Sequence, residues 1–125
     1  MLLGWTMVTV TILLTVIGQI IVKWQIAKVQ PPAAQLPELV FWVFRMAINP
    51  WLVLVAVLVF TAGGAWFVAM SRLPLNQTYP ILGATFPLVV IGSTMFLNER
   101  MSVLQLAGTF LVMAGVAVLG YSASR

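Results

Sequence analysis

The stretch WLVLVAVLVFTAGGAWFVAM, residues 51–70, runs for 20 positions without a charged residue or a proline. An α-helix of about 20 apolar residues is long enough to cross the hydrocarbon core of a bilayer. The rest of the chain has the same character, with 62% hydrophobic and 6% charged residues. Soluble domains contain about 45–50% apolar and about 25% charged residues. The sequence therefore predicts an integral membrane protein.

Three further apolar stretches have the length of a membrane span, at about 2–22, 78–97 and 103–121. The first has no positively charged start and is longer than the apolar part of a signal peptide, so we expect it to be retained. The last two stretches are separated by about five residues and should form an antiparallel hairpin. We predict an all-α membrane protein with four transmembrane helices, folded as a single transmembrane domain over 1–125.

The connection between the first two spans is the longest in the chain. Its first part, QPPAAQLP (30–37), contains three prolines and is not expected to form a regular helix. Its second part, ELVFWVFRMAIN (38–49), predicts a short amphipathic helix, interfacial or re-entrant rather than spanning. The polar face of this helix carries Glu38, Trp42, Arg45 and Asn49. It either anchors the chain on the membrane surface or presents Arg45 to the entrance of a cavity.

The charged residues indicate an orientation and exclude several function classes. The first and third loops hold Lys23, Lys28, Arg45 and Arg100, whereas the other side holds Arg72 and Arg125. This excess places the first and third loops in the cytoplasm, although it is weak enough to permit both orientations and hence an antiparallel dimer. The net charge of +4 is scattered, so we expect no nucleic-acid partner.

The chain contains no cysteine, no histidine and only two acidic residues. Disulfides, most metal sites and nucleophile–base pairs are therefore excluded. We expect no metal, no cofactor and no enzymatic activity.

The first span carries a polar residue at every fourth position, namely Thr11, Thr15, Gln19 and Lys23. Residues four apart are neighbours on one face of a helix. A threonine hydroxyl is satisfied by bonding to the carbonyl of the preceding turn, but the amide of Gln19 would remain unsatisfied in hydrocarbon. We therefore predict that Gln19, together with Thr11 and Thr15, borders a polar groove that ends at Lys23. Lys23 alone is also explained as an anchor that reaches the membrane surface.

The third span is the least regular, because Pro80 and Pro87 each remove a backbone donor. Broken helices of this kind line the substrate sites of many transporters. Tyr79 then offers an aromatic face and a hydroxyl at the mouth of a cavity, or belongs to an interfacial aromatic belt. Trp66 lies deeper than such a belt requires and is a candidate for a cavity wall.

The fourth span aligns Gly108 and Gly115 on one stripe of small residues. Small residues let transmembrane helices approach closely. We predict that this stripe contacts a second subunit, in a homodimer or a heterodimer with a paralogue.

The order and spacing of several of these features resemble a known repeat. Residues 71–120 contain Leu73-Pro74-Leu75, Tyr79-Pro80, Asn98-Glu99-Arg100 and Gly108 followed by Ala114-Gly115. This pattern is similar to the drug/metabolite transporter superfamily, the EamA-like proteins. Four-helix chains of this length resemble its small members, the small multidrug resistance exporters and the flippase subunits for aminoarabinose-phosphoundecaprenol. The insertion at 30–49 is absent from the small multidrug pattern.

The chain differs from the small multidrug exporters at one position of the first helix. Small multidrug exporters carry a glutamate in the first helix, and the stretch TVIGQIIVK places Thr15 at that position. Threonine does not titrate near neutrality, so that antiport mechanism lacks its proton carrier. The chain resembles the flippase subunits more than the small multidrug exporters at two places, namely Gly18-Gln19 with Lys23 and Tyr79-Pro80.

The resemblance implies a multi-pass protein of the inner membrane that moves a polyprenyl-phosphate-linked sugar, or a similar anionic lipid, between leaflets. The residues expected to bind it are Thr15, Gln19, Lys23, Arg45, Trp66 and Tyr79. Two alternatives remain. One is an exporter of small drugs or metabolites of the small multidrug resistance type, with Glu99 or no residue as its coupling group. The other is a non-transporting structural subunit of a membrane complex.

Overall fold

The computed structural model describes residues 1–29, 31–32 and 35–125. These residues form helices and no strands. The elements are α1 (Leu2–Lys28), α2 (Leu36–Ala47), α3 (Pro50–Met70), α4 (Leu75–Ile81), the 3₁₀ turn η1 (Leu82–Ala84), α5 (Thr85–Leu97) and α6 (Val103–Ala123). Four helical segments are long and apolar enough to cross a membrane: α1, α3, Leu75–Leu97 and α6. The predicted all-α membrane fold with four spans and a short additional helix is confirmed.

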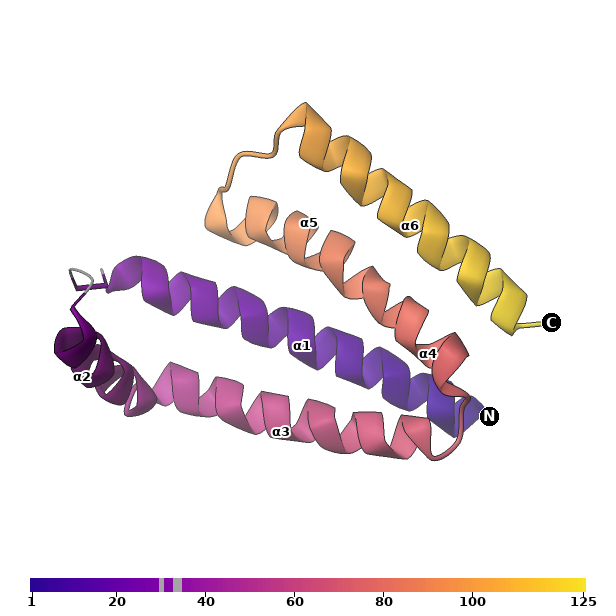
Figure 1. The fold of residues 1–125 in the computed structure, drawn as a ribbon, viewed down its shortest axis with the longest axis horizontal. Helices are drawn as coiled ribbons and strands as arrows, with labels where there is room; N and C mark the ends of the chain where they lie inside the picture. Colours follow the sequence, from indigo (N-terminus) through magenta and orange to yellow (C-terminus); the bar gives the residue numbers. More distant parts are fainter. Residues whose placement is uncertain (30, 33–34) are drawn as a thin grey trace.

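Helix α1 is central, since it packs against α3 on one side and α5 on the other (Figure 1). Helix α6 lies at the outer edge and contacts α4, η1 and α5. Both termini lie at one end of the bundle, whereas α2 and the α5–α6 connection lie at the opposite end.

The best-packed region surrounds the N-terminal half of α1. Val8 and Ile12 of α1 are buried against Ala69 and Leu73, which lie at and just beyond the end of α3. Gly4 permits this approach, because a Cβ at that position would lie 2.7 Å from Cγ of Leu73. Small residues facing larger ones allow two transmembrane helices to come together closely. This cluster fixes α3 to α1 at the end of the bundle that holds the termini.

A polar and aromatic corner joins the other end of α1 to α3. Asn49 caps α3 by accepting a hydrogen bond from the backbone N–H of Trp51 at 3.0 Å. Its Nδ2 donates to Oε1 of the buried Gln25 at 3.3 Å. The rings of Trp24 and Trp51 meet edge to face, with their centroids 5.4 Å apart. These contacts hold the start of α3 beside the end of α1.

Helix α2 begins at Leu36, two positions before the predicted start at residue 38. Proline is tolerated in the first turn of a helix, where its missing N–H would have no partner, and Pro37 occupies such a position. The expectation that all of 30–37 is non-helical is therefore wrong for its last two residues. Within the same stretch, Pro31 and Pro32 are non-helical, while residues 30, 33 and 34 lie outside the described residues.

The third span is divided by a tighter turn between Pro80 and Pro87. The 3₁₀ segment η1 occupies three residues there, after α4 and before α5. Because Pro87 has no N–H, the carbonyl of Gly83 loses its usual helical donor. Gly83 also lets α6 come close, since a Cβ at that position would lie 3.2 Å from Cγ2 of Val116.

Helix α6 begins with a capping box. The hydroxyl of Ser102 accepts from the N–H of Gln105 at 3.2 Å, and the Gln105 side chain accepts from the N–H of Ser102 at 2.9 Å. No residue of α6 is buried by the described part of the chain. A Cβ on Gly108 or Gly115 would meet no atom of the described residues within 4 Å. The glycine stripe thus lies on an open face.

Candidate functional site

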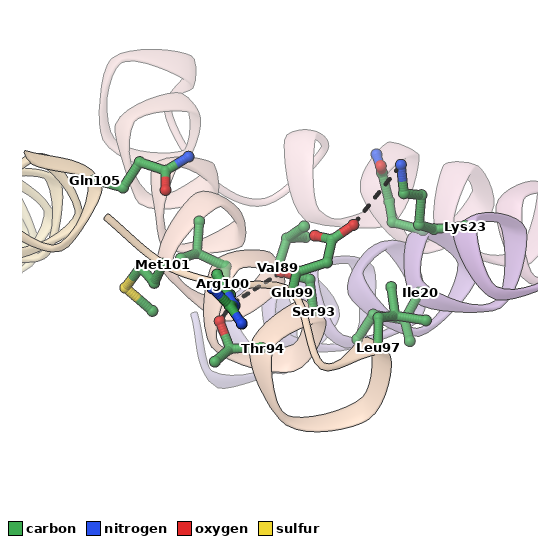
Figure 2. Close-up of a pocket in the computed structure, with 12 residues that line it drawn as sticks. Ile20, Lys23, Val89, Ser93, Thr94, Leu97, Glu99, Arg100, Met101 and Gln105 are labelled. Atoms are coloured by element: carbon green, nitrogen blue, oxygen red, sulfur yellow. Dashed lines mark hydrogen bonds and ion pairs between the residues drawn. The ribbon is translucent and has the colours of Figure 1, made fainter. Parts of the chain in front are cut away.

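A polar groove opens at the end of the bundle opposite the termini. It has a volume of about 320 Å³ and lies between the C-terminal half of α1, the C-terminal half of α5 and the start of α6. The polar and charged residues that line it are Gln19, Lys23, Ser93, Thr94, Glu99, Arg100 and Gln105. Figure 2 shows ten of the lining residues by name, with Lys23 and Gln105 on opposite sides of Glu99. Seven polar or charged side chains therefore line one groove.

Lys23 and Glu99 form an ion pair across the groove. Nζ of Lys23 lies 3.7 Å from Oε1 of Glu99, and the two side chains are 61% and 46% exposed. Ion pairs this exposed contribute only about 0–1 kcal/mol to folding stability. Both charges are therefore available to a ligand at little energetic cost.

The turn after α5 places Glu99 at this position. Asn98 ends the helix with a left-handed backbone at φ 52°, a conformation that asparagine tolerates better than most residues. The backbone N–H of Glu99 then donates to the carbonyl of Ser93 at 3.4 Å. The chain is thereby folded back over the end of α5, which directs Glu99 toward α1 (Figure 2).

The pairing of Glu99 with Lys23 is not among the predictions made from the sequence. A signal was present, because the first and third loops lie on the same side of a four-span protein. The only carboxylate of the third loop is Glu99, and Lys23 ends the first predicted span.

The polar stripe of α1 is divided between two faces. Thr11 is buried against α3, where its hydroxyl lies 3.3 Å from the carbonyl of Ala62 and 2.9 Å from that of Met7. The Thr15 hydroxyl donates to the carbonyl of Thr11 at 2.7 Å. Gln19 and Lys23 line the groove beside α5. Residues four apart drift around a helix, so the first member faces α3 and the last two face α5.

Several groove residues are held by their own helix or cap while still offering polar atoms. The hydroxyls of Ser93 and Thr94 both donate to the carbonyl of Val90, at 3.0 and 2.9 Å. Each hydroxyl oxygen keeps its capacity to accept a hydrogen bond. Gln105 uses its carbonyl oxygen in the cap of α6, which leaves its NH₂ group outside that cap. The groove thus presents both donors and acceptors.

Thr15 is not among the residues that line the groove, and the other three candidate residues lie elsewhere in the fold. Arg45 lines a separate hollow on α2 together with Glu38 and Trp42. Trp66 packs against the apolar cluster near the termini, and its ring meets that of Tyr79 edge to face, with centroids 5.7 Å apart at 73°. The Tyr79 side chain is 61% exposed. The structure therefore brings together Gln19 and Lys23 but places Arg45 and the aromatic pair at two other positions.

Comparison with curated proteins identifies the relatives of this chain. The probable 4-amino-4-deoxy-L-arabinose-phosphoundecaprenol flippase subunit ArnE of Pseudomonas aeruginosa (strain LESB58) is 32% identical over 114 residues, covering 90% of this chain and 93% of the relative. The chain belongs to this family of flippase subunits. The probable subunit ArnF of Serratia proteamaculans (strain 568) is 28% identical, covering 96% of this chain and 94% of the relative. The corresponding ArnF of Sodalis glossinidius is 29% identical over 93% of this chain.

No family model and no solved structure matches the chain. Membership of the flippase-subunit family therefore rests on the curated relatives, which resemble this chain over nearly its whole length. Their names describe transport subunits and not enzymes, in agreement with the prediction from the sequence.

Proposed function

We propose that this chain is a subunit of a flippase that moves a polyprenyl-phosphate-linked amino sugar between the two leaflets of a membrane. The observation that carries the proposal is the groove that holds Gln19 and Lys23 at one end of a bundle of four apolar spans. A charged, hydrogen-bonding surface beside membrane-spanning helices is costly unless it serves a polar ligand or a wet pathway. The names of the relatives supply such a ligand, a sugar joined through phosphate to a long lipid.

The chemistry of the headgroup suggests a binding role for each residue of the site. The ammonium of Lys23 attracts the phosphate, and the amide of Gln19 bonds to sugar hydroxyls. Thr15 lies one turn from Gln19 and offers its hydroxyl oxygen as an acceptor. Arg45 lies on α2, at the same end of the bundle, and adds positive charge to that side of the membrane. The lipid tail stays in the bilayer, so the pathway needs to shelter only the headgroup.

Trp66 packs against the apolar cluster near the termini, and its partner Tyr79 lies on α4 at that end of the bundle, whereas Lys23 lies toward the other end of α1. We assign them to the other end of the pathway, where an aromatic face and a phenol hydroxyl receive the sugar. The charge distribution favours a cytoplasmic position for the Lys23 end. Pro80 and Pro87 give the third span the irregular backbone that such pathways use.

A single chain of four spans encloses little volume, so we propose that a second subunit completes the pathway. The relatives carry two subunit names, which favours a paralogue as the partner over a second copy of this chain. The open face of α6 with Gly108 and Gly115 is suited to close helix contact. We place the complex in the bacterial inner membrane and the family within the drug/metabolite transporter superfamily.

The proposal is tested by reconstitution into vesicles that contain the lipid-linked amino sugar. A membrane-impermeant amine reagent reports how fast headgroups reach the outer leaflet. The double variant Gln19→Leu, Lys23→Leu is expected to reduce that rate at least about tenfold, because it removes both polar partners of the headgroup. The matched control is Lys28→Leu, which removes a lysine that lies over the ring of Trp24 and outside the groove.

The experiment is carried out with the chain alone and with its partner subunit. An unchanged rate in the double variant would reject the assigned pathway. Absence of flipping under both conditions in the unaltered protein would reject the flippase assignment itself.

A further inference from the structure

We propose that Glu99 is a specificity residue that recognises the protonated amine of the headgroup, while Lys23 binds its phosphate. The inference rests on the proposed function, because the amine and the phosphate are features of the lipid named in the relatives. It goes beyond that function by assigning the choice between aminated and non-aminated sugars to one carboxylate.

The first support is the sign of the charges in the groove. A site for a purely anionic lipid would gain nothing from a carboxylate beside its lysine, since like charges repel. Here Glu99 lines the same groove as Lys23 and lies 3.7 Å from it. Arg100 supplies a second cation from the adjacent position. The groove thus carries both signs of charge, as does an amino sugar joined to a phosphate.

The second support is the energetic balance of binding. In the empty groove, Lys23 and Glu99 neutralise each other. A headgroup with an ammonium and a phosphate replaces both partners at once, so each protein charge exchanges one opposite charge for another. A headgroup with only a phosphate draws Lys23 away and leaves the Glu99 carboxylate facing a negative group. Such an uncompensated charge is an effective way to reject the wrong ligand.

The third support is the size and lining of the groove. Its volume of about 320 Å³ lies at the lower end for small-molecule sites, which suits one sugar ring and not an oligosaccharide. Hydroxyl and amide groups from Gln19, Ser93 and Thr94 lie among the charged residues. They provide hydrogen bonds for the ring that connects the amine to the phosphate.

The test compares two lipids that differ in one group. The first is a short polyprenyl phosphate that carries 4-amino-4-deoxy-L-arabinose, and the second carries arabinose with a hydroxyl in place of the amine. Dissociation constants for both are measured with the purified full chain and its partner in mild detergent. We expect the unaltered protein to prefer the amino lipid about tenfold, the effect of one charge-assisted hydrogen bond at a half-exposed site.

Three variants test which residue causes the preference for the amino lipid. Glu99→Gln should bring the ratio of the two dissociation constants close to unity, because it weakens the amino lipid and removes the repulsion that disfavours the hydroxyl lipid. Lys23→Gln should weaken both lipids by similar factors. The other carboxylate of the chain provides the matched control, because Glu38 lies in the separate hollow on α2 and Glu38→Gln should leave the ratio unchanged. Should Glu99→Gln fold poorly, Glu99→Asp keeps the charge and should retain a reduced preference.

The possible results distinguish failure of the proposed function from failure of the role assigned to Glu99. Binding of neither lipid by the unaltered protein would reject the proposed function. Equal binding of both lipids, or a preference that survives Glu99→Gln, would overturn the role of Glu99 and leave the flippase proposal standing. A Glu99→Gln variant that weakens both lipids equally would show that the ion pair only shapes the groove.

Discussion

The two halves of α1 have opposite surroundings. The N-terminal half is buried in an apolar cluster, with Val8 1% exposed and its neighbour Ala69 fully buried. The C-terminal half borders a groove where Lys23 and Glu99 remain about half exposed. One continuous helix therefore serves as a rigid support at one end and as a wall of a polar site at the other.

The residues that stabilise the fold and the residues that line the candidate site therefore lie at opposite ends of α1. Hydrophobic burial gives little drive for helices to associate in lipid, so close packing of small residues holds α1 to α3. Polar residues can then line the opposite end without weakening the cluster. We therefore expect substitutions in the apolar cluster to change stability and substitutions in the groove to change ligand binding.

The largest effect on stability is expected from Leu73→Ala. Leu73 is 5% exposed and packs against the apolar cluster, so its truncation leaves a cavity. We expect a loss of about 3 kcal/mol in the free energy of unfolding, measured by denaturant titration in detergent. The control is Leu13→Ala on α1, whose side chain is 51% exposed, so its truncation should change stability by less than about 0.5 kcal/mol. Similar losses in the two variants would contradict the packed end as the source of stability.

A smaller effect is expected from Asn98→Val, which tests how the groove end is built. A β-branched residue at φ 52° is strained by about 1–2 kcal/mol, and the strain displaces Glu99. We expect a lower thermal unfolding temperature together with a weaker preference for the amino lipid. Asn98→Gly accepts the same backbone and should preserve both. If Asn98→Val left the preference intact, the turn would not be what positions Glu99.

The smallest effect is expected from Thr11→Val, within the buried part of the polar stripe. The substitution removes the contact of its hydroxyl with the Ala62 carbonyl, at 3.3 Å. Hydrogen bonds between transmembrane helices contribute about 0.6 kcal/mol on average, so stability should fall by that amount with no change in flipping. Thr9→Val is the matched control, because the exposed Thr9 bonds only to Trp5 of its own helix among the described residues. Loss of transport in Thr11→Val would place the pathway on the α3 side of α1.

Much of the fold could be predicted because hydropathy is a local property. The stretch 51–70 and its three counterparts show their character without reference to their neighbours, and Pro80 with Pro87 marks an irregular third span. The candidate site was harder to predict from the sequence. Gln19 and Lys23 share the polar stripe of the first span and line one groove in the structure, whereas the pairing of Lys23 with Glu99 required knowledge of how the α5–α6 turn folds back.

The sequence alone predicts four membrane-spanning helices, a short helix between the first two, and polar groups that recur along the first span. Each of these follows from the composition of a continuous segment. The packing of the helices places Thr11 against α3, Lys23 beside Glu99, and Arg45 in a different hollow. The physical reason is that the environment of a helix face depends on which other helices pack against it, and every apolar helix in a bilayer has several faces on which another helix can pack.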